Sequence, residues 1–116
     1  MKSLEESEIL NYDEALARLM NDEEILLIVY AEYVRTIHMQ LNDLEKGIAE
    51  SDNELVIRSA HSIKGASLSI GAEVVAYHAF ALETASKAEE VVQYEELKNK
   101  IATALDEVLP VIKGYL

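Results

Sequence analysis

The sequence contains no cysteine and no tryptophan, and it has only one proline and four glycines in 116 residues. Without cysteine the chain can have neither a disulfide framework nor thiolate chemistry. Basic residues are also scarce: ten lysines and arginines stand against 22 acidic residues, leaving a net charge of −12. Because nucleic-acid binding depends on a basic surface, this charge argues against a nucleic-acid partner.

Long apolar segments are missing too. The run from Ile25 to Tyr30 is far shorter than the roughly 20 residues that a membrane-spanning helix needs. The opening residues Met1-Lys2-Ser3-Leu4-Glu5-Glu6 turn acidic at once and lack the apolar stretch of a secretory signal. We therefore expect a cytoplasmic protein that does not insert into a membrane.

What the chain does have is the composition of a helical protein. Half of its residues are hydrophobic, so it can bury a core. Strand-type alternation is absent, and Ala, Leu, Glu and Lys predominate. We predict an all-α domain over residues 1–116, an antiparallel four-helix bundle with a short additional N-terminal helix. The expected helices cover residues 13–20, 22–50, 53–70, 72–89 and 94–115.

Local signals refine these limits. Asn21, with Glu24 three residues later, predicts a capping box at the start of the long helix 22–50. Gly71 ends the helix 53–70, and Pro110 is expected to kink or fray the last turn of the chain. The apolar positions expected to face the core of the helix 22–50 are Ile25, Leu26, Val29, Tyr33, Ile37, Leu41, Leu44 and Ile48.

The helix 53–70 carries the most informative pattern. Advancing about 100° per residue divides its side chains into two opposite faces. One face, with several apolar and small residues, looks buried: Val56, Ser59, Ile63, Ala66, Ser67 and Ile70. The other is expected to point outward: Ile57, Arg58, His61, Lys64, Gly65, Leu68 and, if the helix reaches it, Ala72. His61 is therefore predicted to be exposed near the middle of its helix.

The neighbours of His61 suit a reactive imidazole. A glycine inside a helix costs about 1 kcal/mol relative to alanine, so Gly65 needs a reason; the missing side chain would let a partner approach the ring closely. Lys64 can turn its ammonium toward an anionic group on the ring, such as phosphoryl. Ile57, Arg58, Leu68 and Ala72 are predicted to form a docking surface around the site.

The remaining candidates have structural interpretations. Ser67 is expected to pack or to bond to the backbone, and Gly71 to end its helix. His38 and His78 are expected at surface or boundary positions. No histidine has a histidine partner four residues away, so no metal site is predicted.

The segment from Ala60 to Ala72, AHSIKGASLSIGA, resembles the signature of histidine-containing phosphotransfer (HPt) domains: a histidine, lysine and glycine three and four residues later, a small residue or serine, and a glycine ten after the histidine. Leu82-Glu83 resembles a leucine-glutamate pair in the family's next helix. Tyr33 stands where the family usually has an aromatic residue. The resemblance extends over most of the chain.

The resemblance implies that His61 accepts a phosphoryl group, on Nε2, from the phosphoaspartate of one receiver domain and passes it to another. Lys64 would steady the phosphoryl oxygens and Gly65 would keep the approach open. The partners implied are the receiver domains of response regulators and of a hybrid histidine kinase. Mg²⁺ would be bound by the receiver and no cofactor by this chain, which would be a stoichiometric carrier without kinase activity and a monomer.

Two alternatives are left open. The chain could be the phosphoacceptor module of a larger hybrid or chemotaxis-type kinase, although such modules resemble a pattern with an aromatic residue where this chain has Ile70. It could also be a helical adaptor that is never phosphorylated. The sequence does not identify the kinase, the regulator or the signal, and it does not decide between a free-standing protein and a fragment of a multidomain kinase.

Overall fold

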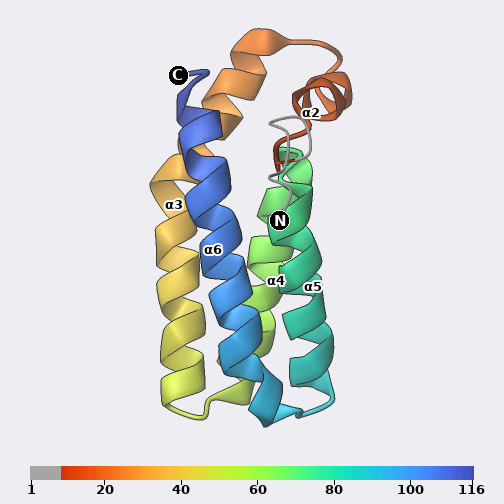
Figure 1. The fold of residues 1–116 in the computed structure, drawn as a ribbon. Helices are drawn as coiled ribbons and strands as arrows, with labels where there is room; N and C mark the ends of the chain where they lie inside the picture. Colours follow the sequence, from red (N-terminus) through yellow and green to blue (C-terminus); the bar gives the residue numbers. More distant parts are fainter. Residues whose placement is uncertain (1–8) are drawn as a thin grey trace, which may run out of the picture.

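The computed structural model describes residues 9–116, in which every regular element is helical, as predicted. The elements in chain order are α2 (Tyr12–Arg18), α3 (Glu23–Ala49), α4 (Asn53–Ser69), α5 (Glu73–Lys87), the 3₁₀ turn η1 (Val91–Gln93) and α6 (Tyr94–Lys113). The long helices α3, α4, α5 and α6 alternate in direction and form a four-helix bundle, which α2 crosses at one end (Figure 1).

The predicted helix limits differ from these by one or two residues, and the reason lies in the caps. Asp22, not Asn21, caps α3, because its carboxylate accepts a hydrogen bond from the Ile25 amide. Asn21 instead adopts a left-handed backbone with φ of 61° in the turn before the helix, a conformation that asparagine tolerates well. The predicted cap at Asn21 is therefore wrong by one residue. Pro110 lies inside α6, which continues to Lys113.

The core lies between the four long helices. The largest fully buried side chains include Leu26, Tyr30, Ile37 and Leu44 of α3, Ile63 of α4, Leu82 of α5, and Ile101, Leu105 and Ile112 of α6. One position of the predicted α3 stripe is wrong, since Ile25 is 44% exposed. Ile25 lies about 100° around the helix from Leu26, and Leu26 takes the buried position.

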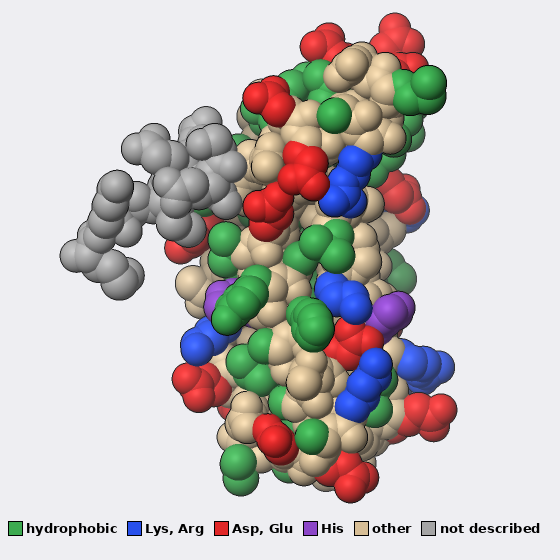
Figure 2. Space-filling model, turned by 90° about the vertical axis from the view of Figure 1, so that its right-hand side faces the viewer, with side chains coloured by type: hydrophobic (Ala, Val, Ile, Leu, Met, Phe, Trp, Pro, Cys, Tyr) green, Lys and Arg blue, Asp and Glu red, His purple; other side chains and the backbone are tan. Residues whose placement is uncertain are grey.

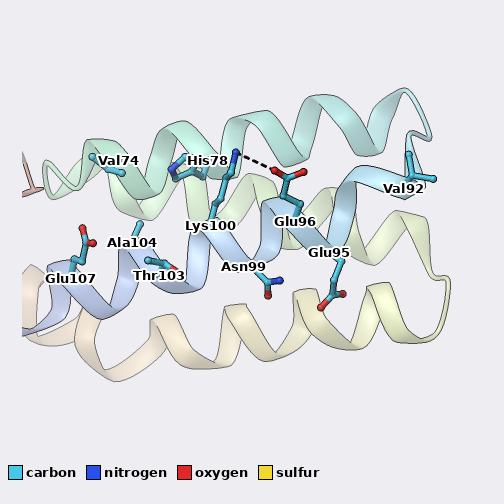
Figure 3. Close-up of a pocket in the computed structure, with 10 residues that line it drawn as sticks. All are labelled: Val74, His78, Val92, Glu95, Glu96, Asn99, Lys100, Thr103, Ala104 and Glu107. Atoms are coloured by element: carbon cyan, nitrogen blue, oxygen red, sulfur yellow. Dashed lines mark ion pairs between the residues drawn. The ribbon is translucent and has the colours of Figure 1, made fainter. Parts of the chain in front are cut away.

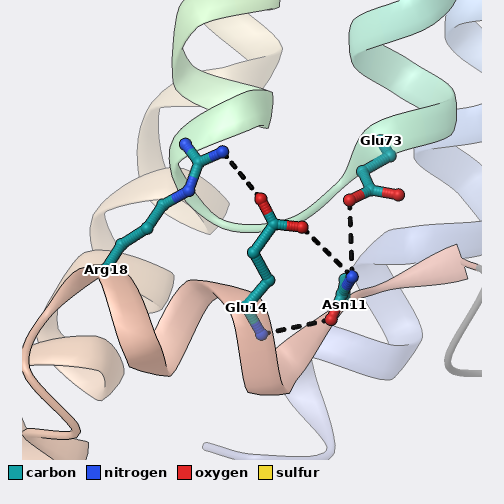
Figure 4. Close-up of polar contacts among 4 residues, drawn as sticks. All are labelled: Asn11, Glu14, Arg18 and Glu73. Atoms are coloured by element: carbon teal, nitrogen blue, oxygen red, sulfur yellow. Dashed lines mark hydrogen bonds and ion pairs between the residues drawn. The ribbon is translucent and has the colours of Figure 1, made fainter.

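The helix α2 is fixed to the turn between α4 and α5. Asn11 caps α2 by accepting a hydrogen bond from the Glu14 amide at 3.1 Å, and its side-chain nitrogen reaches Glu14 and Glu73 (Figure 4). The Asn11 amide also donates to the Gly71 carbonyl oxygen at 2.9 Å. Gly71 has a φ of 79°, and a Cβ there would collide with the Asn11 carbonyl. Glycine at this position is therefore required by the docking of α2.

Candidate functional site

His61 lies in the middle of α4, and 65% of its side chain is exposed. On the same face, Arg58 and Gly65 are exposed, Leu68 is 41% exposed, and Ile57 is half-buried. The opposite face packs into the bundle through side chains that include Val56, Ile63 and Ser67. The helical rotation expected from the sequence thus matches the burial in α4, and the imidazole projects from the bundle.

A buried glutamate of the next helix holds the imidazole. Glu83 of α5 has a side chain that is only 7% exposed, and its Oε2 lies 2.9 Å from Nδ1 of His61. Its Oε1 lies 2.8 Å from Nζ of Lys64, and Nζ of Lys87, one turn further along α5, lies 3.2 Å from Oε2. One carboxylate therefore joins the histidine to two lysines.

The charge of this carboxylate determines the tautomer of His61. Burial raises the pKa of Glu83, but the hydrogen bonds from Lys64, His61 and Lys87 together outweigh it and lower that pKa to about 2. An ionised carboxylate can only accept hydrogen bonds, so the proton of the neutral imidazole is on Nδ1 and is donated to Glu83. The lone pair is then on Nε2, the ring nitrogen that the carboxylate does not hold.

The same pKa predicts how stability depends on pH. A carboxyl whose pKa falls from 4.5 in the reference state to about 2 in the folded chain stabilises the fold fully above pH 4.5, and this contribution is lost as the pH falls toward 2. We expect Glu83→Gln to lower Tm by roughly 4–8 °C at pH 7, corresponding to roughly 1–2 kcal/mol. The difference from wild type should shrink between pH 4.5 and pH 2. Thermal unfolding followed by circular dichroism checks this, with exposed Glu45→Gln as control; a difference that does not change with pH would contradict it.

Gly65 leaves open space one turn from His61. A Cβ built at this position meets no atom within 4 Å, so nothing inside the chain requires glycine there. The position is exposed and follows Lys64 directly. The absence of a side chain therefore affects what can approach the imidazole from outside and has no role in the internal packing.

Ser67 lies on the opposite, buried side of α4. Its hydroxyl is 2.9 Å from the hydroxyl of Tyr33 in α3. Ser67 is fully buried, as the expected packing role requires, and its hydrogen-bond partner is a side chain and not the backbone. Burial raises the pKa of Tyr33 to about 12, and the bond to Ser67 opposes that rise. The pair joins α3 to α4 behind the site and keeps both hydroxyls satisfied in the core.

Ala72 does not belong to the outward surface. It is fully buried and is the N-cap residue of α5, because α4 ends at Ser69 and the chain turns through Gly71 before reaching it. A rotation of 100° per residue no longer applies beyond the helix end. The prediction that Ala72 contributes to docking is therefore wrong.

The sequence reasoning missed Glu83 and Lys87 as parts of the site. Glu83 had been noted only for its resemblance to a family pair. An acidic residue next to Leu82, within the apolar stripe of α5, was the available signal, because a glutamate that faces the interior needs a cationic partner. The Glu83–Lys87 spacing of four residues was a second signal.

A wide groove lies elsewhere on the surface. It has a volume of about 650 Å³, runs between α5 and α6, and contains His78 together with Glu95, Glu96 and Lys100 (Figure 3). Partial burial, and to a smaller extent Lys100, lowers the pKa of His78. Nothing comparable to the Glu83 contact orients this imidazole among the hydrogen bonds of residues 9–116.

Within residues 9–116, no helix is both long and apolar enough to cross a bilayer. No group of three or more His, Asp or Glu side chains in that range is arranged to hold a metal ion.

Comparison with known proteins agrees with this geometry. The model of the Hpt domain family matches residues 29–109, which include both His61 and Glu83. No curated protein matches the sequence. The crystal structure of histidine-containing phosphotransfer protein B from Pseudomonas aeruginosa PAO1 has a similar fold, with a TM-score of 0.82 and 23% identity over 88% of this chain and 90% of that one. The chain therefore belongs to the Hpt domain family, and its role is phosphotransfer in a phosphorelay.

Proposed function

We propose that His61 is the phosphoacceptor and that Nε2 is the atom that carries the phosphoryl group. The observation that supports this most directly is the contact of Nδ1 with the Glu83 carboxylate, which leaves Nε2 as the free nitrogen of an exposed ring. A neutral nitrogen with an accessible lone pair is a nucleophile, whereas the protonated Nδ1 is not. His78, in the groove between α5 and α6, has no such carboxylate contact among the hydrogen bonds of residues 9–116.

The transfer step follows from these positions. The Nε2 lone pair forms a bond to the phosphorus of a receiver's aspartyl phosphate, and the bond from phosphorus to the aspartate oxygen breaks. The electron pair returns to the aspartate carboxylate. The ring, still protonated at Nδ1, becomes cationic, and the Glu83 carboxylate stabilises that charge. Transfer onward reverses the bonds: an aspartate oxygen of a second receiver attacks phosphorus, and the electron pair of the N–P bond returns to Nε2.

The lysines supply positive charge to the phosphoryl oxygens. Lys64 and Lys87 both lie within 3.2 Å of Glu83, and the Lys87 side chain is 61% exposed. A lysine side chain has a flexible four-carbon stem, so either ammonium can turn from the carboxylate toward a phosphoryl group on Nε2. Phosphoryl transfer depends mainly on alignment and charge stabilisation, and the fixed imidazole and the two lysines are this chain's contribution to both.

In this proposal the partners are receiver domains of response regulators and of a hybrid histidine kinase. They would supply Mg²⁺ and its carboxylate ligands, and this chain would act as a monomeric carrier without kinase activity. The cytoplasm is the expected location, since ATP is the ultimate source of the phosphoryl group there.

The experiment is transfer of radiolabelled phosphate from a phosphorylated receiver to the purified chain in the presence of Mg²⁺. A label that is labile in acid and stable in base identifies phosphohistidine. Incubation with ATP alone tests for kinase activity, and we expect no label. A folded chain that takes up no label from several receivers would contradict the proposal and favour the adaptor alternative.

Gly65→Leu tests the open approach to the imidazole. The new side chain has room within the chain and should stabilise α4 by up to about 1 kcal/mol. It would project beside His61, and we expect transfer from a phospho-receiver to slow by at least roughly tenfold, the cost of about 1.4 kcal/mol of lost contact. Gly65→Ala is the matched control and should retain most of the activity. Transfer at the wild-type rate by the leucine variant would show that the partner does not approach over this position.

A further inference from the structure

Exposed apolar side chains lie next to the His61 site on the α5 side. Two aromatic side chains of α5, Phe80 and Tyr77, are 52% and 72% exposed. Phe80 is next to the site, because Nζ of Lys64 lies 5.3 Å from the centre of its ring. Leu68 of α4 is also exposed. Large apolar side chains exposed together mark surfaces that contact other molecules.

These side chains border a shallow groove. It has a volume of about 510 Å³ and is lined by Tyr77, Phe80, Ala81 and Thr84, with Glu90 and Gln93 at its far end. Figure 2 looks at the α5 side of the molecule and shows hydrophobic side chains gathered at mid-height, next to several lysine or arginine side chains. The surface therefore combines apolar area with positive charge in a chain whose net charge is −12.

The surface on the other side of His61, toward α3, is more polar. The groove between α3 and α4 is lined mainly by polar side chains, including Gln40, Asp43, Arg58 and Ser62. On the α5 side, Lys64 of α4 and Lys87 of α5 lie beside His61, and both contact the Glu83 carboxylate. The exposed aromatic area therefore favours the α5 flank for a partner with an apolar rim, and the flexible stems of the two lysines let their ammonium groups turn toward acidic groups of that partner.

The proposed transfer reaction determines the charge of the partner's surface. A protein that presents an aspartyl phosphate with bound Mg²⁺ must hold the metal with carboxylates, so the surface around its phosphoryl group is acidic. A standard interface buries about 800 Å² on each partner, which corresponds to a disc of roughly 16 Å radius around the reacting atom. Phe80 is in contact with Lys64 and lies within such a disc centred on His61.

We propose that the phospho-receiver docks asymmetrically, over α4 and α5, with Phe80 and Tyr77 as its apolar anchors and Lys64 and Lys87 facing its acidic surface. This inference rests on the proposed function of His61. It assigns the binding surface to the α5 side and adds two residues that the sequence did not suggest. Aromatic side chains at the centre of an interface commonly contribute most of its binding energy.

The test compares the double variant Tyr77→Ala/Phe80→Ala with Met39→Ala. Met39 is 64% exposed and lies on α3, so its truncation removes exposed apolar surface from another helix. We expect the double variant to lower the second-order rate of transfer from a phospho-receiver by about 10- to 100-fold, and Met39→Ala to change it less than about twofold. Equal transfer by the double variant and wild type, or an equal loss in Met39→Ala, would overturn the proposal.

Labelling by phosphoramidate, a small donor that needs no docking surface, separates the two proposals. If the double variant loses transfer from the receiver but is labelled normally by phosphoramidate, the chemistry is intact and docking is impaired. If its labelling by phosphoramidate falls equally, the aromatic pair acts on His61 itself, and the docking assignment is wrong. If the wild-type chain is labelled by neither donor, the proposed function itself fails.

Discussion

Replacing His61 by glutamine is expected to abolish phosphoryl uptake completely while leaving the fold intact. Glutamine can still donate a hydrogen bond toward Glu83, but its amide nitrogen has no basic lone pair to attack phosphorus. Because 65% of the His61 side chain is exposed, little packing is lost, and we expect Tm to change by less than roughly 4 °C, equivalent to at most about 1 kcal/mol. Label incorporated from a phospho-receiver and from phosphoramidate, together with circular dichroism melting, measures both effects.

His78→Gln is the matched control for this variant. His78 lies in the groove between α5 and α6 and is only partly exposed. We expect the His78→Gln substitution to leave phosphoryl uptake unchanged. Residual acid-labile label in His61→Gln would show that another nitrogen accepts phosphate. A large loss of helicity in His61→Gln would show instead that the imidazole supports the fold through Glu83 and would weaken its assignment as a simple exposed acceptor.

The sequence predicted the fold closely because the signals that determine it are local. Helical periodicity and capping residues act within about one turn, so the limits of α3 to α6 could be placed within two residues. Within α4 the same periodicity placed His61 outside and Ile63 inside. The errors occur at helix ends: Ala72 lies beyond the end of α4 and is buried, and Ile25 stands in the first turn of α3 and is exposed.

The charge arrangement at the site could not be predicted in the same way. Glu83 reaches His61 only because α4 and α5 pack side by side at one relative height, and residues 22 apart in sequence give no local sign of this. Periodicity indicated which face of α5 is buried but did not give the rotation of α5 relative to α4. For the same reason Phe80, which contacts Lys64 across the two helices, could not be associated with the site.

The buried carboxylate explains why the site combines reactivity with order. An isolated exposed histidine would exchange its proton between the two ring nitrogens and rotate freely. Contact with Glu83 fixes the ring, and the two lysines make it possible for this carboxylate to remain ionised although it is buried. If His61 is the phosphoacceptor as proposed, the bundle thus orients the ring from behind while Nε2 stays exposed.

Glu83→Ala is therefore expected to slow phosphoryl uptake by about 100-fold, by analogy with the upper end of the loss found when the carboxylate that orients a metal-bound histidine is removed. Without the carboxylate, the proton is no longer held on Nδ1, the cationic phosphoimidazole is not stabilised, and Lys64 and Lys87 lose their common anchor. Glu83→Gln keeps an acceptor oxygen for Nδ1–H but no charge, so we expect an intermediate loss of roughly tenfold. Single-turnover labelling by phosphoramidate and by a phospho-receiver gives the rates.

Nitrogen NMR of the His61 ring distinguishes this orienting role from a purely structural one. In the wild type we expect the neutral ring to be protonated on Nδ1, because an ionised Glu83 can only accept. In Glu83→Ala the proton should move largely to Nε2, the nitrogen that must be free for attack, and in Glu83→Gln Nδ1–H should persist. Because Glu83→Ala also removes a buried charge, the rates are compared at a temperature where all three chains are folded. An alanine variant with the wild-type tautomer and slow uptake would show that Glu83 acts through the lysines and not through the ring.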